Sequence, residues 1–375
     1  MKFAHISDTH LGYKQYGLLD RENDFFETFE KIIDNIIEER PDFVIHSGDF
    51  FSTEKPSTKT LLEVQKALSK LKDNNIPIYA IAGNHDKKMR KDSIPPQELY
   101  KYLGLKILDT FKPFHVLNDV FIGGTQYFSK VYLDSLLTQI EYIEHESSSY
   151  NKRILVLHQA VDKYFSLNHE LEIGDIPKTF HYYAFGHIHN RIIDDYGEGK
   201  IGYPGCPEIF RADEIKNYKE NGKGYHLIDF STNTPEVELI NIPLSREIIN
   251  KTIEYSNMDN EMAELEDEIS KYAKKPILKI NIIGESINRP DAYTIVDKSI
   301  NRSCLHYETN YNPIDVNEEE YSDDNNELDP NNILKFKLEK YDEKCQDFAI
   351  DLLHKTSHND IEEAKYFARK FYEEL

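Results

Sequence analysis

Short apolar runs that each end in a polar cluster are the feature that most limits how this chain of 375 residues can fold. Runs of this length, rich in β-branched and aromatic residues and followed by polar residues, are typical of strands in a buried sheet. Five of them occur in the first 230 residues, at Lys2–Ser7, Asp42–Ser47, Pro77–Ala82, Arg153–His158 and Tyr182–Phe185.

Helical patterns lie between these predicted strands. After the first run, Phe25 and Phe29 begin an apolar face with helical spacing, and the pattern ends before Pro41. Two further helices are expected over Ser57–Lys72 and Ser129–Glu146. Strands that alternate with helices at this spacing indicate an α/β fold in which helices pack on sheets.

The polar clusters carry side chains that bind metal ions. They read Asp8-Thr9-His10, Gly48-Asp49, Gly83-Asn84-His85-Asp86, His158 and Gly186-His187-Ile188-His189. A single Asp-x-His or a histidine at a strand end is weak evidence, because such a histidine is often a hydrogen-bonded core residue. In α/β sheets, however, the loops beyond the carboxyl ends of the strands converge, so we expect the five clusters to meet in one crevice.

The set of donor atoms favours two divalent ions. Carboxylate, amide and imidazole groups without a thiolate suit Mn²⁺ or Fe²⁺. A single zinc ion would use three or four ligands, whereas this chain offers seven candidates. The candidate ligands are Asp8, His10, Asp49, Asn84, His158, His187 and His189.

Two of the motif residues have distinct expected roles. Asp49 is the candidate bridge between two ions roughly 3.5–4 Å apart, an arrangement that activates water and holds a phosphoryl group for in-line attack. His85 is not needed as a ligand and is free to act as a general acid. The alternative for His85 is a residue that only orients a ligand.

The charge of the chain argues against simple binding to nucleic acid. The chain has 67 acidic and 45 basic residues, a net charge of −22, which repels phosphate polymers at long range. DNA binding would therefore need bound cations or a local basic patch. The candidate DNA-binding residues are Lys14, Lys87, Lys88, Arg90 and Lys91, and the alternative is that they are solvated loop residues.

Cysteine usage and hydropathy indicate a cytoplasmic protein. Cys206, Cys304 and Cys345 are far apart and form no CxxC pair, which suits a reducing compartment. No apolar run reaches the roughly 18 residues that a membrane helix needs, and the N-terminus carries no secretory signal. We therefore expect no membrane association.

The pattern changes near Pro235. A strand candidate at Glu236–Ile242 could close the first unit, and a helix near Glu261–Tyr272 and a strand at Ile277–Ile283 indicate a small α+β domain. Eight carboxylates without a Lys or Arg between Asp315 and Asp329 are typical of a solvated linker. The predicted domains are 1–233, 234–313, a linker at 314–332 and a helix-loop-helix at 333–375.

The tail has the spacing of two heptad-patterned helices, one from Leu334 to Leu352 and one from Ile361 to Leu375. Because an acidic linker precedes them, we expect them to bind a helical partner, with packing on the chain's own body as the alternative. The candidate partner-binding residues are Leu338, Phe348, Leu352, Phe367 and Phe371.

The order of the metal motifs resembles the calcineurin-like metallophosphoesterase superfamily over residues 1 to about 230. Within it, the segments HISDTHLGYKQYG and HSGDFF and the tail beyond residue 330 resemble the archaeal DNA double-strand break repair nucleases of the meiotic-recombination-eleven (Mre) family. The resemblance implies a metallophosphoesterase β-sandwich flanked by helices, a small capping domain for DNA and a C-terminal helical hairpin.

The resemblance also implies the activity. The expected enzyme is a DNA nuclease with two Mn²⁺ ions, with Mg²⁺ and Fe²⁺ as alternatives, in which a metal-bound hydroxide attacks a phosphodiester in line. It implies 3'-5' exonuclease activity on double strands and endonuclease activity on single strands. The alternatives are a phosphoesterase for small substrates or phosphoproteins, and a catalytically silent scaffold.

The resemblance further implies partners and ligand sets. A homodimer would form through the helices near Leu61 and Leu103, and a coiled-coil ABC-type ATPase would bind the tail. His85 would be the catalytic acid or position the phosphate, and Ser52 stands where many members carry a second catalytic histidine. One ion would lie among Asp8, His10, Asp49 and His189, and the other among Asp49, Asn84, His158 and His187.

Overall fold

The computed structural model describes residues 1–86, 94–232, 234–313, 338, 345–350 and 352. The chain divides into two compact units, Met1–Ile314 and Asp315–Leu375. In the second unit, Leu338 lies in a turn, whereas Phe348 and Leu352 are helical. Of the residues predicted to bind a partner, Phe367 and Phe371 lie outside the described part of the chain.

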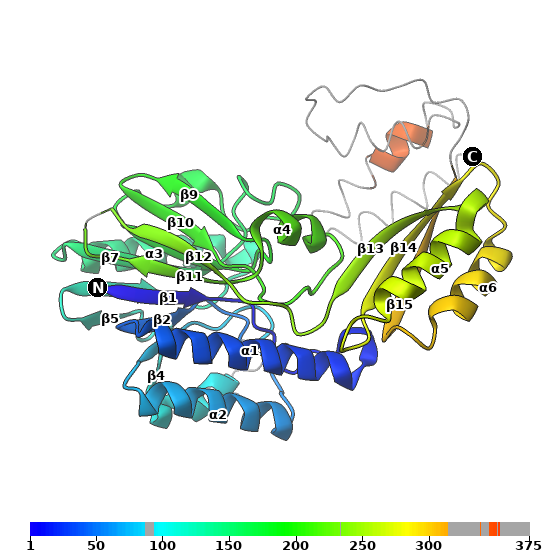
Figure 1. Ribbon diagram of the computed structural model, residues 1–375. Helices are drawn as coiled ribbons and strands as arrows, with labels where there is room; N and C mark the ends of the chain where they lie inside the picture. The colour runs from blue at the N-terminus through cyan, green and yellow to red at the C-terminus, as the bar shows by residue number, and fades with distance from the viewer. Residues whose placement is uncertain (87–93, 233, 314–337, 339–344, 351, 353–375) are drawn as a thin grey trace. The chain divides into compact units, whose positions relative to one another are not determined.

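Two six-stranded sheets form the larger part of the first unit (Figure 1). The first has the order β12-β11-β1-β2-β3-β4 and the second the order β5-β6-β7-β8-β10-β9. Their strands are β1 (Lys2–Ile6), β2 (Phe43–His46), β3 (Ile78–Ala80), β4 (Leu105–Ile107), β5 (Phe114–Leu117), β6 (Val120–Gly124), β7 (Lys152–His158), β8 (Tyr182–Gly186), β9 (Ile192–Tyr196), β10 (Gly199–Tyr203), β11 (Gly224–Asp229) and β12 (Glu236–Asn241). The five predicted strands are confirmed as β1, β2, β3, β7 and β8.

The sheets pack face to face around a fully buried layer of aromatic and β-branched side chains. Phe3 of β1 stacks on Phe43 of β2 with 4.8 Å between ring centroids, and Tyr182 of β8 meets Phe3 edge-on at 5.4 Å. Strands buried on both faces read as continuous apolar runs, as observed here for β2 and β8.

Helices cover the outer faces of the two sheets, which confirms the predicted β-sandwich flanked by helices. The cluster on the outside of the first sheet joins α1 and α2, and the cluster on the second sheet joins α3. The helices are α1 (Leu19–Glu39), α2 (Thr58–Asp73), α3 (Leu133–Ser147) and α4 (Glu214–Asn221), with short 3-10 helices η1 (Gln15–Gly17), η2 (Pro96–Leu103), η3 (Lys130–Tyr132) and η4 (Ile173–Asp175).

Local sequence explains where the two longest helices begin and end. The α1 helix stops at Arg40, whose φ of 51° is left-handed, directly before Pro41, which cannot continue a helix. The α2 helix begins after Ser57, whose side chain accepts a hydrogen bond from the backbone N–H of Thr60 at 3.1 Å.

A third, three-stranded parallel sheet has a separate core with two helices packed on it. Its elements are β13 (Ile248–Glu254), η5 (Tyr255–Asn257), α5 (Met258–Ile269), β14 (Ile277–Gly284), α6 (Arg289–Ile300) and β15 (His306–Pro313). The β12 strand instead pairs antiparallel with β11 in the first sheet. We therefore place the start of the proposed capping domain after β12 and not at residue 234.

A buried network of charges connects this small domain to α1. The Asp24 carboxylate accepts hydrogen bonds from Arg246 Nε at 2.7 Å, Arg21 Nη1 at 2.8 Å and Lys274 Nζ at 3.3 Å. Arg21, which is fully buried, also donates to Glu208 Oε2 at 3.1 Å. Because Arg246 lies just before β13 and Lys274 just before β14, their ion pairs attach the small domain to α1.

The two helices proposed for a dimer interface expose apolar side chains, but Leu61 and Leu103 are not the exposed ones. Leu61 of α2 packs against the core, and Leu103 of η2 is buried. The exposed apolar residues on the same two helices are Leu62, Leu99 and Tyr102. Among the described residues, no helix has the length and apolar character that crossing a membrane requires.

Candidate metal centre

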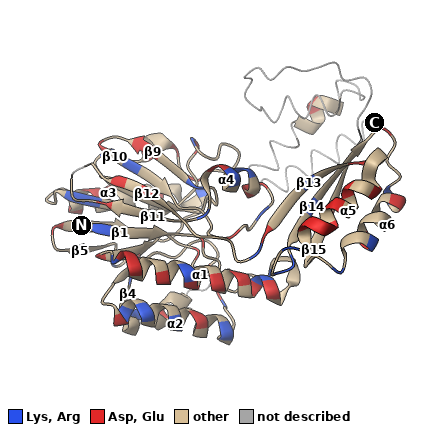
Figure 2. Cartoon of the chain, viewed as in Figure 1, with Lys and Arg blue, Asp and Glu red and all other residues tan. Residues whose placement is uncertain are grey.

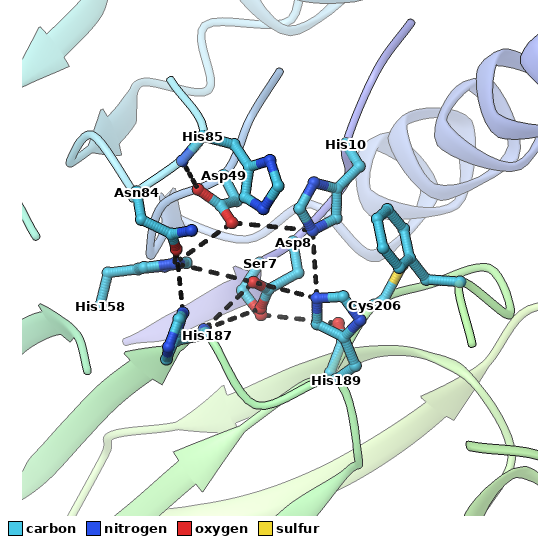
Figure 3. A network of polar contacts seen from close by, with 12 residues as sticks. Ser7, Asp8, His10, Asp49, Asn84, His85, His158, His187, His189 and Cys206 are labelled. Carbon is cyan, nitrogen blue, oxygen red and sulfur yellow. Dashed lines mark hydrogen bonds and ion pairs between the residues drawn. The ribbon is translucent and has the colours of Figure 1, made fainter. Parts of the chain in front are cut away.

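The five predicted clusters meet at one edge of the sandwich. The loops after β1, β2 and β3 of the first sheet bring Asp8, Asp49 and Asn84 to this edge, and the ends of β7 and β8 bring His158 and His187. Because β1, β2 and β3 run parallel, and β7 and β8 also run parallel, the carboxyl ends of the strands coincide. Figure 3 shows the side chains pointing toward a common centre.

Four of the predicted ligands have left-handed backbone conformations. The φ angles are 51° at Asp8, 42° at His10, 53° at Asp49 and 89° at His187. Such angles are unfavourable for residues with a Cβ and persist where the surrounding structure enforces them. The turns that follow the strands therefore aim these side chains inward at a cost in conformational energy.

Two motif glycines are required by close approach of the backbone. A Cβ added to Gly83 would lie 2.0 Å from Asp49 Oδ1, and one added to Gly48 would lie 2.4 Å from His158 Nδ1. Gly48 also has a φ of 98°, which disfavours any other residue. The glycines of Gly-Asp and Gly-Asn-His-Asp thus leave room for the neighbouring metal-binding side chains.

The first group of donors consists of Asp8, His10 and His189, whose ligand atoms all lie within 4.8 Å of one another. His10 Nε2 is 3.1 Å from His189 Nε2 and 3.7 Å from Asp49 Oδ2, and His189 Nε2 is 4.0 Å from Asp8 Oδ1. These four residues are the set expected to hold one ion.

The second group consists of Asp49, His158 and His187, with Asn84 between the two histidines. Asn84 Oδ1 lies 3.1 Å from His158 Nε2 and 2.9 Å from His187 Nδ1. Asp49 Oδ2 is 3.4 Å from His158 Nε2, so this carboxylate contacts donors of both groups. Its position suits the bridging role proposed for Asp49.

The hydrogen-bond pattern requires a cation or a proton between these groups. His158 Nδ1 must donate to the Ser47 carbonyl at 2.8 Å, so Nε2 of a neutral ring presents a lone pair toward the oxygens of Asn84 and Asp49. Burial opposes protonation of His158, but the nearby Asp49 carboxylate outweighs it and raises the pKa to about 9. The lone pairs of His158 Nε2 and of the Asn84 and Asp49 oxygens thus point at one another, and without a metal only a proton offsets their repulsion. A divalent cation fits this position.

His10 and His189 face each other in the same way. His189 Nδ1 donates to Glu214 Oε1 at 3.0 Å, which leaves Nε2 toward His10. Burial lowers the pKa of His10 well below its ordinary value, so its ring is neutral and able to bind a metal. Both groups therefore have the donor atoms that divalent metal ions need, and a bound cation would take the place of the proton on His158.

His85 lies beside the two groups and is exposed. Its backbone N–H donates to Asp49 Oδ1 at 2.9 Å, and its ring Nδ1 donates to the Ser52 carbonyl at 3.3 Å. The backbone of Ser52 thus orients the His85 ring, although the Ser52 side chain cannot replace a catalytic histidine. His85 also lies within 4.8 Å of donors on His10 and Asp49, so its geometry allows an acid or a ligand.

Three residues that border the centre were not predicted from the sequence. Glu170 Oε1 is 3.5 Å from His187 Nε2, and Glu214 contacts both His189 and Lys223. Glu170 lies in a loop and Glu214 at the first turn of α4, where a carboxylate is ordinary, so no sequence signal marks them.

The predicted DNA-binding residues are only partly described. Lys14 is exposed and lies 3.8 Å from Glu22, whereas Lys87, Lys88, Arg90 and Lys91 lie outside the described residues. Six of the twelve residues of α5 are Asp or Glu, coloured red in Figure 2. A DNA backbone would therefore avoid this helix.

Comparisons with known proteins agree with this geometry. The calcineurin-like phosphoesterase family matches residues 1–191. The DNA double-strand break repair protein Mre11 of Methanocaldococcus jannaschii is 40% identical over 282 residues, which cover 74% of this chain and 75% of the relative. The Mre11 protein of Methanococcus maripaludis is 39% identical over 295 residues, with 77% and 79% covered. That of Saccharolobus solfataricus is 36% identical over 301 residues, with 78% of each chain covered.

Proposed function

The chain belongs to the Mre11 family of calcineurin-like phosphoesterases and is a metal-dependent phosphodiesterase, and from this premise we propose that it is a Mn²⁺-dependent DNA nuclease of double-strand break repair. The observation that carries the proposal is the position of Asp49, which contacts donors of two adjacent metal-binding groups. Two donor groups that share one carboxylate are typical of centres that hold two metal ions.

Each side chain of the centre has a defined part in the proposed reaction. Two divalent ions held there would supply an activated water and neutralise charge on the phosphate. The buried carboxylates of Asp8 and Asp49 would hold and orient these ions. His85, whose Nδ1 is engaged by the Ser52 carbonyl, presents Nε2 as the atom that can give a proton to the leaving oxygen.

DNA is the substrate we propose, with double-strand 3'-5' exonuclease and single-strand endonuclease activities. The support is the identity to relatives named for double-strand break repair over three quarters of the chain. The small domain of β13–β15 would help to hold DNA through surfaces other than the acidic α5.

We propose two protein partners for this enzyme. The exposed Leu62, Leu99 and Tyr102 on α2 and η2 suit a symmetric dimer, in which the same apolar patch meets itself. The heptad-patterned tail would bind a coiled-coil ATPase. Co-purification of that ATPase with the full chain, and its loss after deletion of residues 333–375, would test the second partner.

The decisive experiment compares substrates and metals. Purified protein is incubated with labelled single- and double-stranded DNA in Mn²⁺, in Mg²⁺ and in excess chelator. We expect cleavage in Mn²⁺ and none in chelator. Cleavage that persists in chelator would contradict the two-metal reaction. Hydrolysis of a small phosphate monoester without any cleavage of DNA would instead favour a phosphoesterase for small substrates.

A further inference from the structure

We propose that the buried pair Glu214–Lys223 is a positioning device for His189, and that it raises the affinity of the ion position formed by Asp8, His10, Asp49 and His189. The inference rests on the proposed function, because it takes His189 as a metal ligand. It adds two residues that do not themselves belong to either group of donors.

Glu214 fixes the ring of His189. The carboxylate is buried and its Oε1 lies 3.0 Å from His189 Nδ1. The same carboxylate accepts from the backbone N–H groups of Arg211 at 2.9 Å and Phe210 at 3.3 Å, so it cannot rotate away. With Nδ1–H donated to Glu214, the Nε2 lone pair of His189 points to the centre, which is the tautomer that metal binding needs.

Lys223 fixes the backbone of the same residue. Its buried ammonium donates to Glu214 Oε2 at 2.6 Å, to the Cys206 carbonyl at 2.9 Å and to the His189 carbonyl at 3.2 Å. These contacts use all three of its protons. Glu214 and Lys223 therefore hold His189 from both sides, one through the ring and one through the main chain.

The surrounding fold builds this arrangement. The Cys206 N–H also donates to the His189 carbonyl at 3.2 Å, and a Cβ at Gly205 would lie 2.4 Å from that oxygen. The α4 helix is attached to the segment between His189 and β9, because Asn217 Oδ1 accepts from the Arg191 N–H at 2.9 Å. These contacts thus hold α4, which carries Glu214, in a fixed position against the segment that carries His189.

The other histidines of the centre have weaker support. His10 Nδ1 is buried and has no hydrogen-bond partner, His158 Nδ1 donates to a neutral carbonyl, and His187 Nε2 is 3.5 Å from Glu170. Of these four, His189 has the shortest contact with a carboxylate outside the two donor groups, 3.0 Å to Glu214 against 3.5 Å between His187 and Glu170. Loss of such outer partners typically costs about 10–100-fold in metal affinity. We expect the effect to be confined to the ion beside His189.

The test uses Glu214→Gln, with Glu220→Gln on the same helix as a matched control, because Glu220 is exposed. Calorimetric titration with Mn²⁺ should show two sites in the wild type and the control. In Glu214→Gln, one site should weaken about 10–100-fold while the other is unchanged. Paramagnetic resonance at a fixed Mn²⁺ concentration should change from a spin-coupled pair to an isolated ion.

Two further measurements separate positioning from folding. The double variant Glu214→Gln/Lys223→Met removes both buried charges at similar volume, so it can be tested where the single variant does not fold, and it should show the same weakened site. Nitrogen-15 NMR of labelled histidine in the metal-free wild type should show His189 protonated at Nδ1. In Glu214→Gln, the two tautomers should mix.

The outcomes distinguish this inference from the proposed function. If the wild type binds two Mn²⁺ ions and Glu214→Gln and the double variant bind them with unchanged affinities, the pair is only a structural ion pair and the inference is wrong. If the wild type binds no Mn²⁺, the proposed function fails first. Equal weakening of both sites would also contradict a device directed at His189.

Discussion

Neutralising Asp24 should destabilise the protein far more than an ordinary surface change on the same helix. The Asp24 side chain is 1% exposed and is surrounded by three cationic side chains, Arg21, Arg246 and Lys274. In Asp24→Asn the amide retains one acceptor oxygen but loses the charge. Beside that oxygen, Arg246 then has the Lys275 carbonyl at 2.6 Å and the exposed Asp20 at 3.7 Å, so its charge has no buried anionic partner at hydrogen-bond distance.

The expected magnitude follows from these contacts. Removing one partner of a buried ion pair costs about 3–5 kcal/mol, because the remaining charge stays buried without compensation. Arg21 retains Glu208 at 3.1 Å and Gln15 at 2.8 Å, which limits its share of the loss. We therefore expect the free energy of unfolding to fall by about 3–5 kcal/mol in Asp24→Asn.

Asp20→Asn is the matched control, since it lies one turn earlier on α1. The Asp20 side chain is 63% exposed and 3.7 Å from Arg246, so its loss should cost less than about 1 kcal/mol. The assay is urea unfolding followed by circular dichroism, because the chain has no tryptophan to report by fluorescence. A cost for Asp24→Asn within 1 kcal/mol of that for Asp20→Asn would refute the reasoning.

Four further predictions concern the centre, the dimer and acid stability. Asp49→Ala should abolish DNA cleavage and lower bound Mn²⁺ in elemental analysis; normal activity would rule out the bridge. His85→Asn should keep both metals yet lose roughly 10²–10⁴-fold in turnover, whereas loss of metal would make it a ligand. Leu62→Asp should give monomers in light scattering, and a dimer that persists would place the interface elsewhere. Burial lowers the pKa of His5 and His226 well below 6.5, so these rings stay neutral in the fold while the unfolded chain takes up protons. The free energy of unfolding should therefore fall by ~1.4 kcal/mol for each ring as the pH drops from about 7.5 to 5.5. His226→Gln should make this fall smaller, as measured by urea unfolding at the two pH values.

The strands and the donor side chains could be predicted from sequence because one local rule places both. A short apolar run sets the strand, and the next few residues must turn at its carboxyl end, so Asp8, Asp49 and His158 were located together with their strands. Parallel pairing then brings loops that are far apart in sequence to one edge. No knowledge of tertiary packing was needed for this step.

The support around the centre could not be predicted, because it depends on tertiary contacts between charged residues without a motif. In a helical pattern, Arg21 and Asp24 read as residues of a solvated face, yet both are buried, Arg21 beside Glu208 and Asp24 beside Arg246. Glu214 and Lys223 likewise look like surface charges of a short helix and its end. Their partners lie in the segment from His189 to Cys206, and nothing in the sequence shows that α4 packs there.

Apolar surface was also hard to assign from periodicity alone. Leu61 and Leu62 are neighbours in sequence and equally apolar, but one packs against the core and the other is 49% exposed. The apolar face of a helix has no sharp boundary. Whether a residue at the edge of that face is buried depends on the size of the neighbouring element, which periodicity does not show.

The left-handed backbone at four motif residues has a consequence for how such a chain evolves. A glycine at Asp8 or Asp49 would relax a backbone conformation that costs residues with a Cβ up to about 1–2 kcal/mol, and less for Asp, and it would remove a desolvated carboxylate as well. Selection for thermal stability alone would therefore favour inactive sequences. Selection for catalytic activity is needed to retain Asp8 and Asp49. In a collection of stabilised variants of this chain, the motif turns are where a gain in melting temperature would most often accompany a loss of catalysis.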